Sequence, residues 1–449
     1  MAARPGGLML RKLISQAVSV AGLRVVGTGL GVGVSIVLAR AFGTEALGVY
    51  SFCIALMMLA AVPISNGWAG MLLRSVAKQG RLDGLSRSMA RYGAMGALVT
   101  ASIAMVAGAL AVSFGSNDIA QALEPVAFSA IGLLAIALLA DQVSALRMAS
   151  LRGIDRPALA QIPEMILRPA LLICGIGLVW ALLQPEGLAQ TMLGVFAAVA
   201  VAALASAVVG QWILSRVTQV RPLRDVDPET RRMWIASAAA LAGSAGLVQL
   251  NGYIDLLLLG GMRGAEETGL YRAGLQIAML ANFGYIALNM LAGQRFSNFL
   301  AQGDTASAAQ SARYLARLAL LTALPLPIVL LIAGEWLFTL LFGPEFAPAA
   351  TPALIVSLGF CFSAGIGMAH ALLIMSHGEF IAMRTTAVAL AINVALCFAL
   401  IPAYGLIGAA LANVGASVCW NILLWYFARQ RTGIDSSFLG FLAPSTRPG

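Results

Sequence analysis

The basic residues of this chain lie almost entirely on one side of a membrane that the sequence crosses many times. Twelve apolar segments are each long enough to span a bilayer, for which a helix needs about 20 residues. Of the 28 Lys and Arg residues, 23 fall at the two ends of the chain or in every second loop between these segments. Cytoplasmic loops of membrane proteins are enriched in Lys and Arg. The pattern therefore predicts a multi-pass protein of the bacterial inner membrane, with both termini in the cytoplasm.

The composition agrees with a lipid-facing surface. Hydrophobic residues make up 60% of the chain and charged residues 10%, whereas soluble domains are roughly 45–50% apolar and about 25% charged. The net charge of +9 is spread over many cytoplasmic segments. Anionic lipids of the inner leaflet are therefore the expected partner of these residues, and nucleic acid is not.

Several functional classes lack their sequence signals. The five cysteines all fall in apolar segments without the spacing of a metal or redox pair, and only two histidines occur. The sequence predicts no metal site and no cofactor. It also contains no G-x-x-x-x-G-K-[ST] loop for nucleotide phosphates. Any energy input is expected to come from an ion gradient or from consumption of the product.

Helices are the expected secondary structure throughout, because every backbone amide inside lipid must be satisfied within its own segment. The predicted spans are 13–38, 48–72, 90–114, 124–148, 158–182, 188–214, 234–260, 268–293, 314–334, 350–375, 383–401 and 405–428. The longest break, residues 215–232, is a basic cytoplasmic linker. It separates an N-terminal six-helix lobe (1–214) from a C-terminal one (233–430), which a cytoplasmic tail (431–449) follows.

The two lobes look like copies of each other. Matching residues occur in the same order at nearly constant offsets: Gly43/Gly264, Glu45/Glu266, Gly48/Gly269 and Tyr50/Tyr271 at 221, and Asn66/Asn289 at 223. Six helices is an even number, so both copies share one orientation and are related by an axis along the membrane normal. The predicted fold is all-α, with two pseudo-symmetric lobes around a central cleft. An alternating-access transporter is expected to have this architecture.

Three stretches resemble a known family. They are LARAFGTEALGVYSF at 38–52, IDLLLLGGMRGAEETGLYRAG at 254–274, and the pair LFGPEFAPAA at 341–350 and IPAYGLIGAALANVGAS at 401–417. These resemble the polysaccharide flippases of the multidrug/oligosaccharidyl-lipid/polysaccharide exporter (MOP) superfamily. The resemblance implies transfer of undecaprenyl-pyrophosphate-linked oligosaccharide repeat units to the periplasmic leaflet, for lipopolysaccharide or exopolysaccharide synthesis. It also implies work beside a polysaccharide polymerase and chain-length machinery.

Three arginines fall within the apolar segments and are candidate contacts for an anionic substrate. A charge at the bilayer centre costs at least about 2.5–3.5 kcal/mol, and a guanidinium is suited to bidentate binding of phosphate. Arg24 has no acid within one turn of its own helix. Arg168 has a structural alternative, since Glu164 lies one turn before it. Arg272 has another, a bridge to Asp255 on the preceding helix.

Three acids within the spans are candidates for coupling to H⁺ or Na⁺, because the charge of an acid in a dehydrated cleft depends on which side the cleft faces. These are Asp141, Glu164 and Asp255. Asp255 occupies the acid position of the IDLLLLG motif and is the strongest candidate. For Asp141 the alternatives are a pair with Arg168 and a place in the cytoplasmic mouth.

Asn66 and Asn289 occupy matching positions in the two copies and are candidates for binding sugar hydroxyls. The alternative is a hydrogen bond between helices, worth about 0.6 kcal/mol on average.

Two other functions were weighed against the flippase. An ion-coupled drug or cation antiporter of the same superfamily has the same architecture, but three arginines in the spans suit an anion better. A membrane enzyme of polysaccharide assembly needs large periplasmic loops or a cluster of catalytic carboxylates, and the sequence shows neither. No catalytic residue is therefore predicted.

Overall fold

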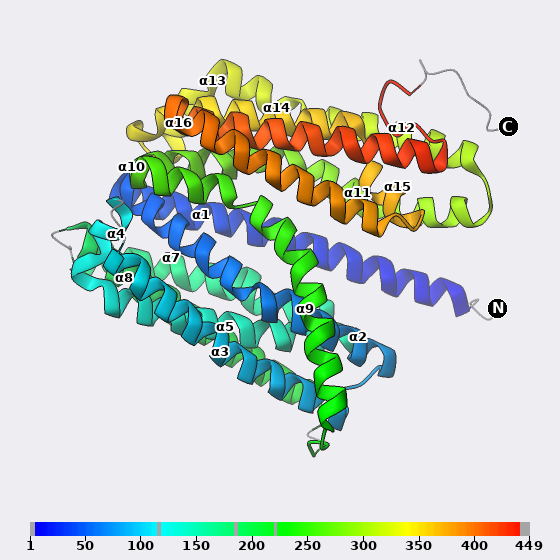
Figure 1. The fold of residues 1–449 in the computed structure, drawn as a ribbon, viewed down its shortest axis with the longest axis horizontal. Coiled ribbons are helices and arrows are strands. Elements are labelled where there is room, and N and C mark those ends of the chain that lie inside the picture. Colours follow the sequence, from blue (N-terminus) through cyan, green and yellow to red (C-terminus); the bar gives the residue numbers. More distant parts are fainter. Residues whose placement is uncertain (1–4, 115–117, 184–186, 220–221, 441–449) are drawn as a thin grey trace. The chain divides into compact units, whose positions relative to one another are not determined.

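The computed structural model describes residues 5–114, 118–183, 187–219 and 222–440. Every regular element within these ranges is a helix (Figure 1). The chain forms two compact units. Unit 1 comprises Met1–Ala46 and Cys53–Gln249, and unit 2 comprises Leu47–Phe52 and Leu250–Gly449. The predicted all-helical fold is confirmed for the described residues.

Among the described residues, ten helical runs are long and apolar enough to cross a membrane: Gly22–Gln79, Gly84–Ser113, Asp118–Gly153, Pro157–Leu182, Leu188–Val217, Pro228–Asn251, Ile254–Ala301, Thr305–Leu341, Pro344–Ile366 and Glu379–Thr432. The first and last have 58 and 54 residues, far more than the roughly 20 residues that one crossing needs. Each covers two predicted spans. The first contains the non-helical Gly43 between its two spans, and the last contains the non-helical Gly405 at the start of its second span. The protein is therefore a multi-pass membrane protein, and the count of twelve spans stays a prediction.

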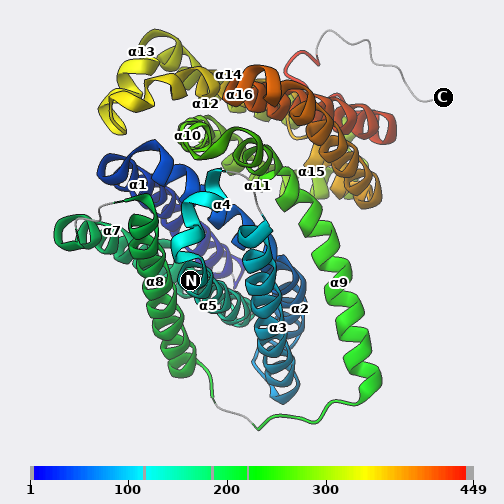
Figure 2. The ribbon, with the colours of Figure 1, turned by 60° about the vertical axis from the view of Figure 1, so that its left-hand side comes forward.

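From residue 5 to residue 251 the helices are α1 (Pro5–Val62), η1 (Pro63–Trp68), α2 (Ala69–Gln79), α3 (Gly84–Phe114), α4 (Asp118–Leu123), η2 (Glu124–Val126), α5 (Ala127–Gly153), α6 (Pro157–Ile162), η3 (Pro163–Leu167), α7 (Arg168–Leu178), η4 (Val179–Leu183), α8 (Leu188–Val217) and α9 (Pro228–Asn251). Helix α5 packs between α3 and α8 (Figure 2). The segments η1 and η3 are π-helical and begin at Pro63 and Pro163. A proline lacks the amide hydrogen of the normal helical ladder, which favours such a local change of pitch.

The remaining helices are α10 (Ile254–Ala278), η5 (Met279–Asn282), α11 (Phe283–Ala301), α12 (Thr305–Ala323), α13 (Pro325–Leu341), η6 (Pro344–Ala349), α14 (Ala350–Ile366), α15 (Ala369–Met375) and α16 (Glu379–Thr432). Helix α16 packs against α10, α14 and α15, and α11 packs against α12 (Figure 1).

The internal repeat of the sequence is also present in the backbone. Gly43 interrupts α1 with φ 81° and ψ −171°, and Gly264 interrupts α10 with φ 86° and ψ −170°. These two glycines are matched in the sequence repeat, and their conformation is one that a residue with a Cβ atom rarely adopts. The same sharp bend therefore occurs at equivalent places in the two copies.

A second matched pair of glycines lies in contact within unit 2. A Cβ atom on Gly48 would overlap the carbonyl oxygen of Ala265 and would lie 3.0 Å from the amide nitrogen of Gly269. Small residues of this kind let membrane helices approach closely. Gly48 and Gly269, predicted to be equivalent, thus face each other where the helical runs after the two bends cross.

Each unit has its own core. In unit 1, α9 packs on the first helices through Trp234 and Ala238, and the Trp68 indole donates a hydrogen bond to the Met89 carbonyl at 2.7 Å. The core of unit 2 includes Phe296 and Leu315 and is otherwise rich in alanine. Large apolar side chains remain exposed on many helices, as expected of a surface in contact with lipid.

Candidate functional site

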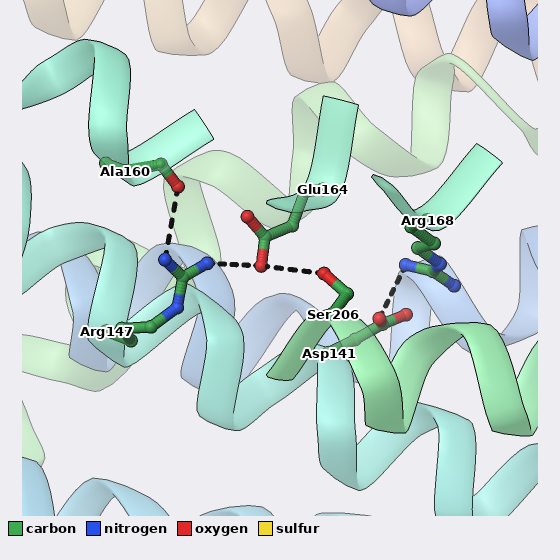
Figure 3. Close-up of polar contacts among 6 residues, drawn as sticks. All are labelled: Asp141, Arg147, Ala160, Glu164, Arg168 and Ser206. Atoms are coloured by element: carbon green, nitrogen blue, oxygen red, sulfur yellow. Dashed lines mark hydrogen bonds and ion pairs between the residues drawn. The ribbon is translucent and has the colours of Figure 1, made fainter. Parts of the chain in front are cut away.

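Four charged side chains meet in the interior of unit 1 (Figure 3). Asp141 and Arg147 lie on α5, Glu164 lies on the π-helical η3, and Arg168 begins α7. Arg168 Nη1 donates to Asp141 Oδ1 at 2.5 Å, and Arg147 Nη2 donates to Glu164 Oε1. The acid of each helix is therefore paired with the base of the other helix.

This crossed pairing corrects the alternative of an ion pair between Glu164 and Arg168 on one helix. The side chain of Arg147 is only 1% exposed. An ion pair within the helix would leave this buried guanidinium without a counter-charge, and an unpaired buried charge costs about 3–5 kcal/mol. Pairing between the helices neutralises all four groups. The other alternative, a pair between Asp141 and Arg168, is the one that the structure contains.

The surroundings hold Arg147 firmly in place. Its Nη1 donates to the Ala160 carbonyl at 3.4 Å. The Ser206 hydroxyl on α8 donates to Glu164 Oε1 at 3.3 Å. Gly210, also on α8, provides the space for the guanidinium, because a Cβ atom there would overlap Arg147 Nε. Three helical segments thus enclose one neutral network.

The network retains unused hydrogen-bonding capacity. Asp141 Oδ2 and Glu164 Oε2 are buried and have no hydrogen-bond partner among the described residues. A carboxylate oxygen that no protein donor occupies is a suitable acceptor for a proton or ligand for a hard cation. Within the described part of the chain, however, no group of three His, Cys, Asp or Glu side chains is arranged to hold a metal ion.

A second buried acid lies in unit 2. Asp255 is fully buried and accepts hydrogen bonds from Tyr271 Oη at 2.5 Å, Asn413 Nδ2 at 2.7 Å and Leu256 N at 2.9 Å. It lies in the first turn of α10, where the partial positive charge of a helix N-terminus favours a carboxylate. Dipoles from three positions, rather than a cationic side chain, stabilise this group.

Polar side chains of α16 continue the Asp255 environment. Asn393 Nδ2 is 3.4 Å from Asn251 Oδ1, and Cys397 Sγ donates to Asn393 Oδ1 at 3.5 Å. Asn393 is buried in the same helix that carries Asn413. Helix α16 therefore supplies hydrogen-bond partners to both α9 and α10 inside unit 2.

Of the three predicted substrate arginines, Arg24 and Arg272 differ from Arg168 in having no counter-charge among the described residues. Arg272 is half-buried and makes no ion pair with any residue in the described ranges, so the suggested bridge to Asp255 is absent. Arg24 is exposed on α1, and its side chain likewise has no described partner. A Cβ atom on Gly27, one turn further, would lie 2.9 Å from Met165 Cβ. The helix of Arg24 therefore packs directly on η3.

The two predicted asparagines have different environments. Asn66 is exposed in the π-helical η1. Asn289 is half-buried in α11, and its Oδ1 atom is buried without a partner in the part of the chain that the structure describes. The suggested role as a hydrogen bond between helices is therefore not seen for either residue among the described contacts.

Several residues of these networks escaped the sequence analysis. Arg147 was counted with the cytoplasmic loops, but it is buried in α5. Ser206, Asn393 and Asn413 were not singled out, although a polar side chain inside an apolar span is itself a signal. Tyr271 was recognised only as a member of the repeat.

The fold resembles that of known transporters. A multidrug resistance MATE family transporter of the MOP superfamily, in an inward-facing conformation, superposes with a TM-score of 0.72 at 15% identity over 91% of this chain and 94% of that one. The lipid II flippase MurJ, in an inward closed conformation, gives 0.71 at 10% identity over 93% and 87%. A MOP superfamily transporter from Pyrococcus furiosus gives 0.62 at 13% identity over 93% and 95%.

At these identities the likeness shows a shared fold and no more. Among curated protein sequences, none matches this chain significantly. A family model described as polysaccharide biosynthesis protein, by contrast, matches residues 14–293, which is more than half of the chain. This match agrees with the resemblance of the motifs to the polysaccharide flippases. The chain belongs to the polysaccharide biosynthesis protein family.

Proposed function

We propose that this protein transfers undecaprenyl-pyrophosphate-linked oligosaccharide repeat units from the cytoplasmic to the periplasmic leaflet of the bacterial inner membrane. Membership of the polysaccharide biosynthesis family supports the pathway. The likeness in fold to a lipid II flippase supports a lipid-linked cargo. The transfer needs no bond to be made or broken, and we assign no catalytic residue. A polysaccharide polymerase and chain-length machinery are the proposed partners.

The observation that carries the proposal is the uncompensated charge of Arg24 in an apolar helix. An arginine in the span is costly without a counter-charge, and this one has no described partner. The two phosphates of the cargo are anionic, and guanidinium–phosphate hydrogen bonds are among the strongest in proteins. Arg24 and Arg272 therefore replace part of the water that the pyrophosphate loses on leaving the cytoplasm. The asparagines Asn66 and Asn289 bond the sugar hydroxyls in this scheme.

Arg168 has a different place in the mechanism, because Asp141 already neutralises it. We propose that Asp141 and Glu164 take up the coupling H⁺ or Na⁺ on their unused oxygens. Binding of the coupling ion at Asp141 weakens the ion pair between Asp141 and Arg168. The Arg168 guanidinium then becomes available to the anionic cargo. Asp255 is the corresponding coupling group of unit 2. Alternating access of the two lobes to either side of the membrane completes the cycle.

One alternative has specific support. The likeness in fold to a MATE family multidrug transporter is as strong as the likeness to the flippase. An ion-coupled drug or cation antiporter is therefore the second candidate function. Arg24 and Arg272, which have no counter-charge among the described residues, disfavour it, because they would repel a cationic drug.

The test is a deletion strain of the native host. The amount of surface polysaccharide and the leaflet location of undecaprenyl-linked repeat units are measured together. We expect loss of polymer with repeat units trapped in the cytoplasmic leaflet. Unchanged polymer and an unchanged lipid-linked pool, together with increased sensitivity to cationic drugs, would replace the flippase by the antiporter.

Complementing the deletion strain with variants of the protein tests the role of Arg24. We expect Arg24→Ala to abolish export at unchanged protein abundance, whereas Arg24→Lys retains part of the activity because it keeps the charge without the bidentate geometry. The control is Arg232→Ala, which removes an exposed basic residue near the start of α9. Normal export by the Arg24→Ala variant would remove this residue from the substrate site.

A further inference from the structure

A basic pocket lies between α11 and α12 in unit 2. Its volume is about 500 Å³. Three arginines line it, Arg295, Arg313 and Arg317, together with hydroxyl groups of serine and tyrosine. None of the described lining residues is acidic. Three like charges around one hollow repel each other, and an anion within it removes that repulsion.

The three arginines differ in the hydrogen bonds that they form with the rest of the protein. Arg295 is exposed and forms no hydrogen bond or ion pair with a described residue, so its guanidinium is available. Arg313 donates from Nε to the Ala309 carbonyl at 3.2 Å and from Nη1 to the Gly440 carbonyl at 3.4 Å. Arg317 Nε donates to the Phe438 carbonyl at 3.4 Å. Backbone carbonyls thus orient two of the guanidinium groups before any ligand arrives.

A second observation points to a missing ligand. Ser311 lines the pocket, and its hydroxyl oxygen is buried and has no partner in the described ranges. Buried hydroxyl groups are normally hydrogen-bonded. The nearby acid Asp304 does not line the pocket, and its carboxylate accepts from Ser307 N at the start of α12, at 2.9 Å. Among the described lining residues the pocket therefore has cationic donors and no acid.

An exposed apolar face adjoins the pocket. Tyr314 lines it and is 62% exposed, and Leu321 and Ile328, 65% and 53% exposed, follow at intervals of seven residues. Seven residues are nearly two turns of a helix, so these side chains share one face of the continuous run from α12 into α13. Tyrosine is enriched where membrane helices leave the hydrocarbon region. A ligand with its head in the pocket can therefore place a hydrocarbon chain along this apolar face.

We propose that this pocket binds the phosphate group of a membrane lipid at the cytoplasmic surface, with Arg295, Arg313 and Arg317 as the charged donors. The basic loop before α12 is the one that the charge pattern assigns to the cytoplasm. Two lipids share the required chemistry. One is the pyrophosphate-linked cargo, in which case the pocket is a loading site beside the transport path and the inference rests on the proposed function. The other is an anionic phospholipid held at the surface.

The experiment measures lipid retention by the purified full-length protein in neutral detergent, using native mass spectrometry. The probes are undecaprenyl pyrophosphate, phosphatidylglycerol and the zwitterionic phosphatidylcholine, with inorganic pyrophosphate as a competitor. We expect the wild type to retain an anionic probe in preference to phosphatidylcholine. Arg295→Gln is expected to weaken binding at least about tenfold, because each hydrogen bond to a charged group is worth that much.

Arg295→Gln is the cleanest variant, since this side chain contacts no other described residue through a polar bond. Arg295→Gln/Arg317→Gln extends the loss, and its melting temperature shows whether the fold is kept. The matched control is Arg231→Gln/Arg232→Gln, which removes two exposed basic residues of α9 outside the pocket. Equal binding by the wild type, Arg295→Gln and this control would overturn the proposal.

The two lipid sources give different results. Preference for undecaprenyl pyrophosphate identifies the cargo headgroup, and preference for phosphatidylglycerol identifies a surface phospholipid. Either preference, abolished by Arg295→Gln, supports the site. Because binding is measured without transport, a failure of the proposed function in the deletion strain leaves this result intact. Conversely, normal binding by the pocket variants removes the site and leaves the flippase proposal standing.

Discussion

Arg147 shows how a single buried charge constrains its neighbours. Its guanidinium is enclosed by α5, α6, η3 and α8, and Glu164 is its counter-charge among the described residues. We expect Arg147→Ala to lower the free energy of unfolding by about 3–5 kcal/mol, since it leaves a partly buried carboxylate without a counter-charge. Titration of the purified protein with a denaturing detergent measures this loss.

The double variant Arg147→Met/Glu164→Gln provides the comparison. It removes both charges and keeps most of the volume, so it is expected to recover a large part of the lost stability. If the double variant is no more stable than Arg147→Ala, the cost comes from lost packing of the arginine and not from the unpaired acid.

Asp304 gives a prediction for pH. Hydrogen bonds from the Ser307 side chain and backbone amide hold the pKa of this exposed carboxyl below its ordinary value. The unfolded chain therefore binds the proton more readily than the folded protein does. The stabilisation is present above the unfolded pKa, about 3.9, and is lost as the pH falls through the lower folded pKa. Melting curves of wild type and Asp304→Asn are expected to converge at low pH and to separate toward neutrality.

At the residue scale the sequence predicts where charges are buried better than which partners they choose. Position within an apolar segment identified Arg24, Arg168 and Arg272. Arg147 lies at the very end of the predicted span 124–148 and was therefore counted with the cytoplasmic loop, whereas α5 continues to Gly153 and buries the arginine. The partner choice depends on which residues of α5 and η3 lie side by side, and no single-helix pattern contains that information.

At the scale of elements, α16 depends on one glycine. Gly405 has φ 55° and ψ −131°, a region open almost only to glycine. A Cβ atom there would lie 3.0 Å from Glu267 Oε1 and closer still to Oε2, and Glu267 Oε2 accepts a hydrogen bond from Leu406 N at 2.7 Å. The carboxylate thus caps the helical segment that follows the bend.

We therefore expect Gly405→Ala to lower the free energy of unfolding by at least about 1–3 kcal/mol, the usual cost of such a strained backbone. Thermal unfolding in detergent is the measurement. The control is Gly132→Ala in α5, where a Cβ atom meets nothing within 4 Å and alanine is the better helix former by about 1 kcal/mol. Equal melting temperatures for the two variants would contradict the role of the bend.

The sequence predicts some features of the helices and not others. The repeat identifies Gly43 and Gly264 as equivalent positions, but it does not predict that the chain bends sharply at both of them. The π-helical segments were not anticipated, since they arise from the local loss of amide donors at Pro63 and Pro163 together with tertiary packing. Counting the membrane crossings also requires the positions of the bends, because the length of an apolar segment alone does not distinguish one long helix from two.

At the scale of the whole molecule, the property to measure is coupling to an ion gradient. A substitution at Asp255 tests it most directly. Asp255→Asn keeps the size of the side chain and can keep the hydrogen bond from Tyr271, so the fold is expected to survive. In proteoliposomes, the variant is expected to lose the acceleration of lipid-linked oligosaccharide transfer by an imposed H⁺ or Na⁺ gradient. A full response to both gradients in this variant would exclude Asp255 from coupling.

Glu164→Gln serves as the comparison in unit 1. It is expected to reduce the same response if both units contribute a coupling group, and to leave it unchanged if unit 2 acts alone. The overall architecture of the family follows from the sequence through its repeat and motifs. The coupling ion does not, because acid side chains alone do not distinguish a proton from a sodium ion.

The crossed ion pairs between α5 and the run from η3 into α7 have a consequence for the biogenesis of the protein. Asp141 and Arg147 of α5 find their partners, Arg168 and Glu164, on the other run. Released alone into the bilayer, α5 would expose the charges of Asp141 and Arg147 without their partners. The connection between Gly153 and Pro157 is short, so both segments leave the ribosome close together. They are therefore expected to enter the membrane as one hairpin, whose charges cancel before either helix meets lipid.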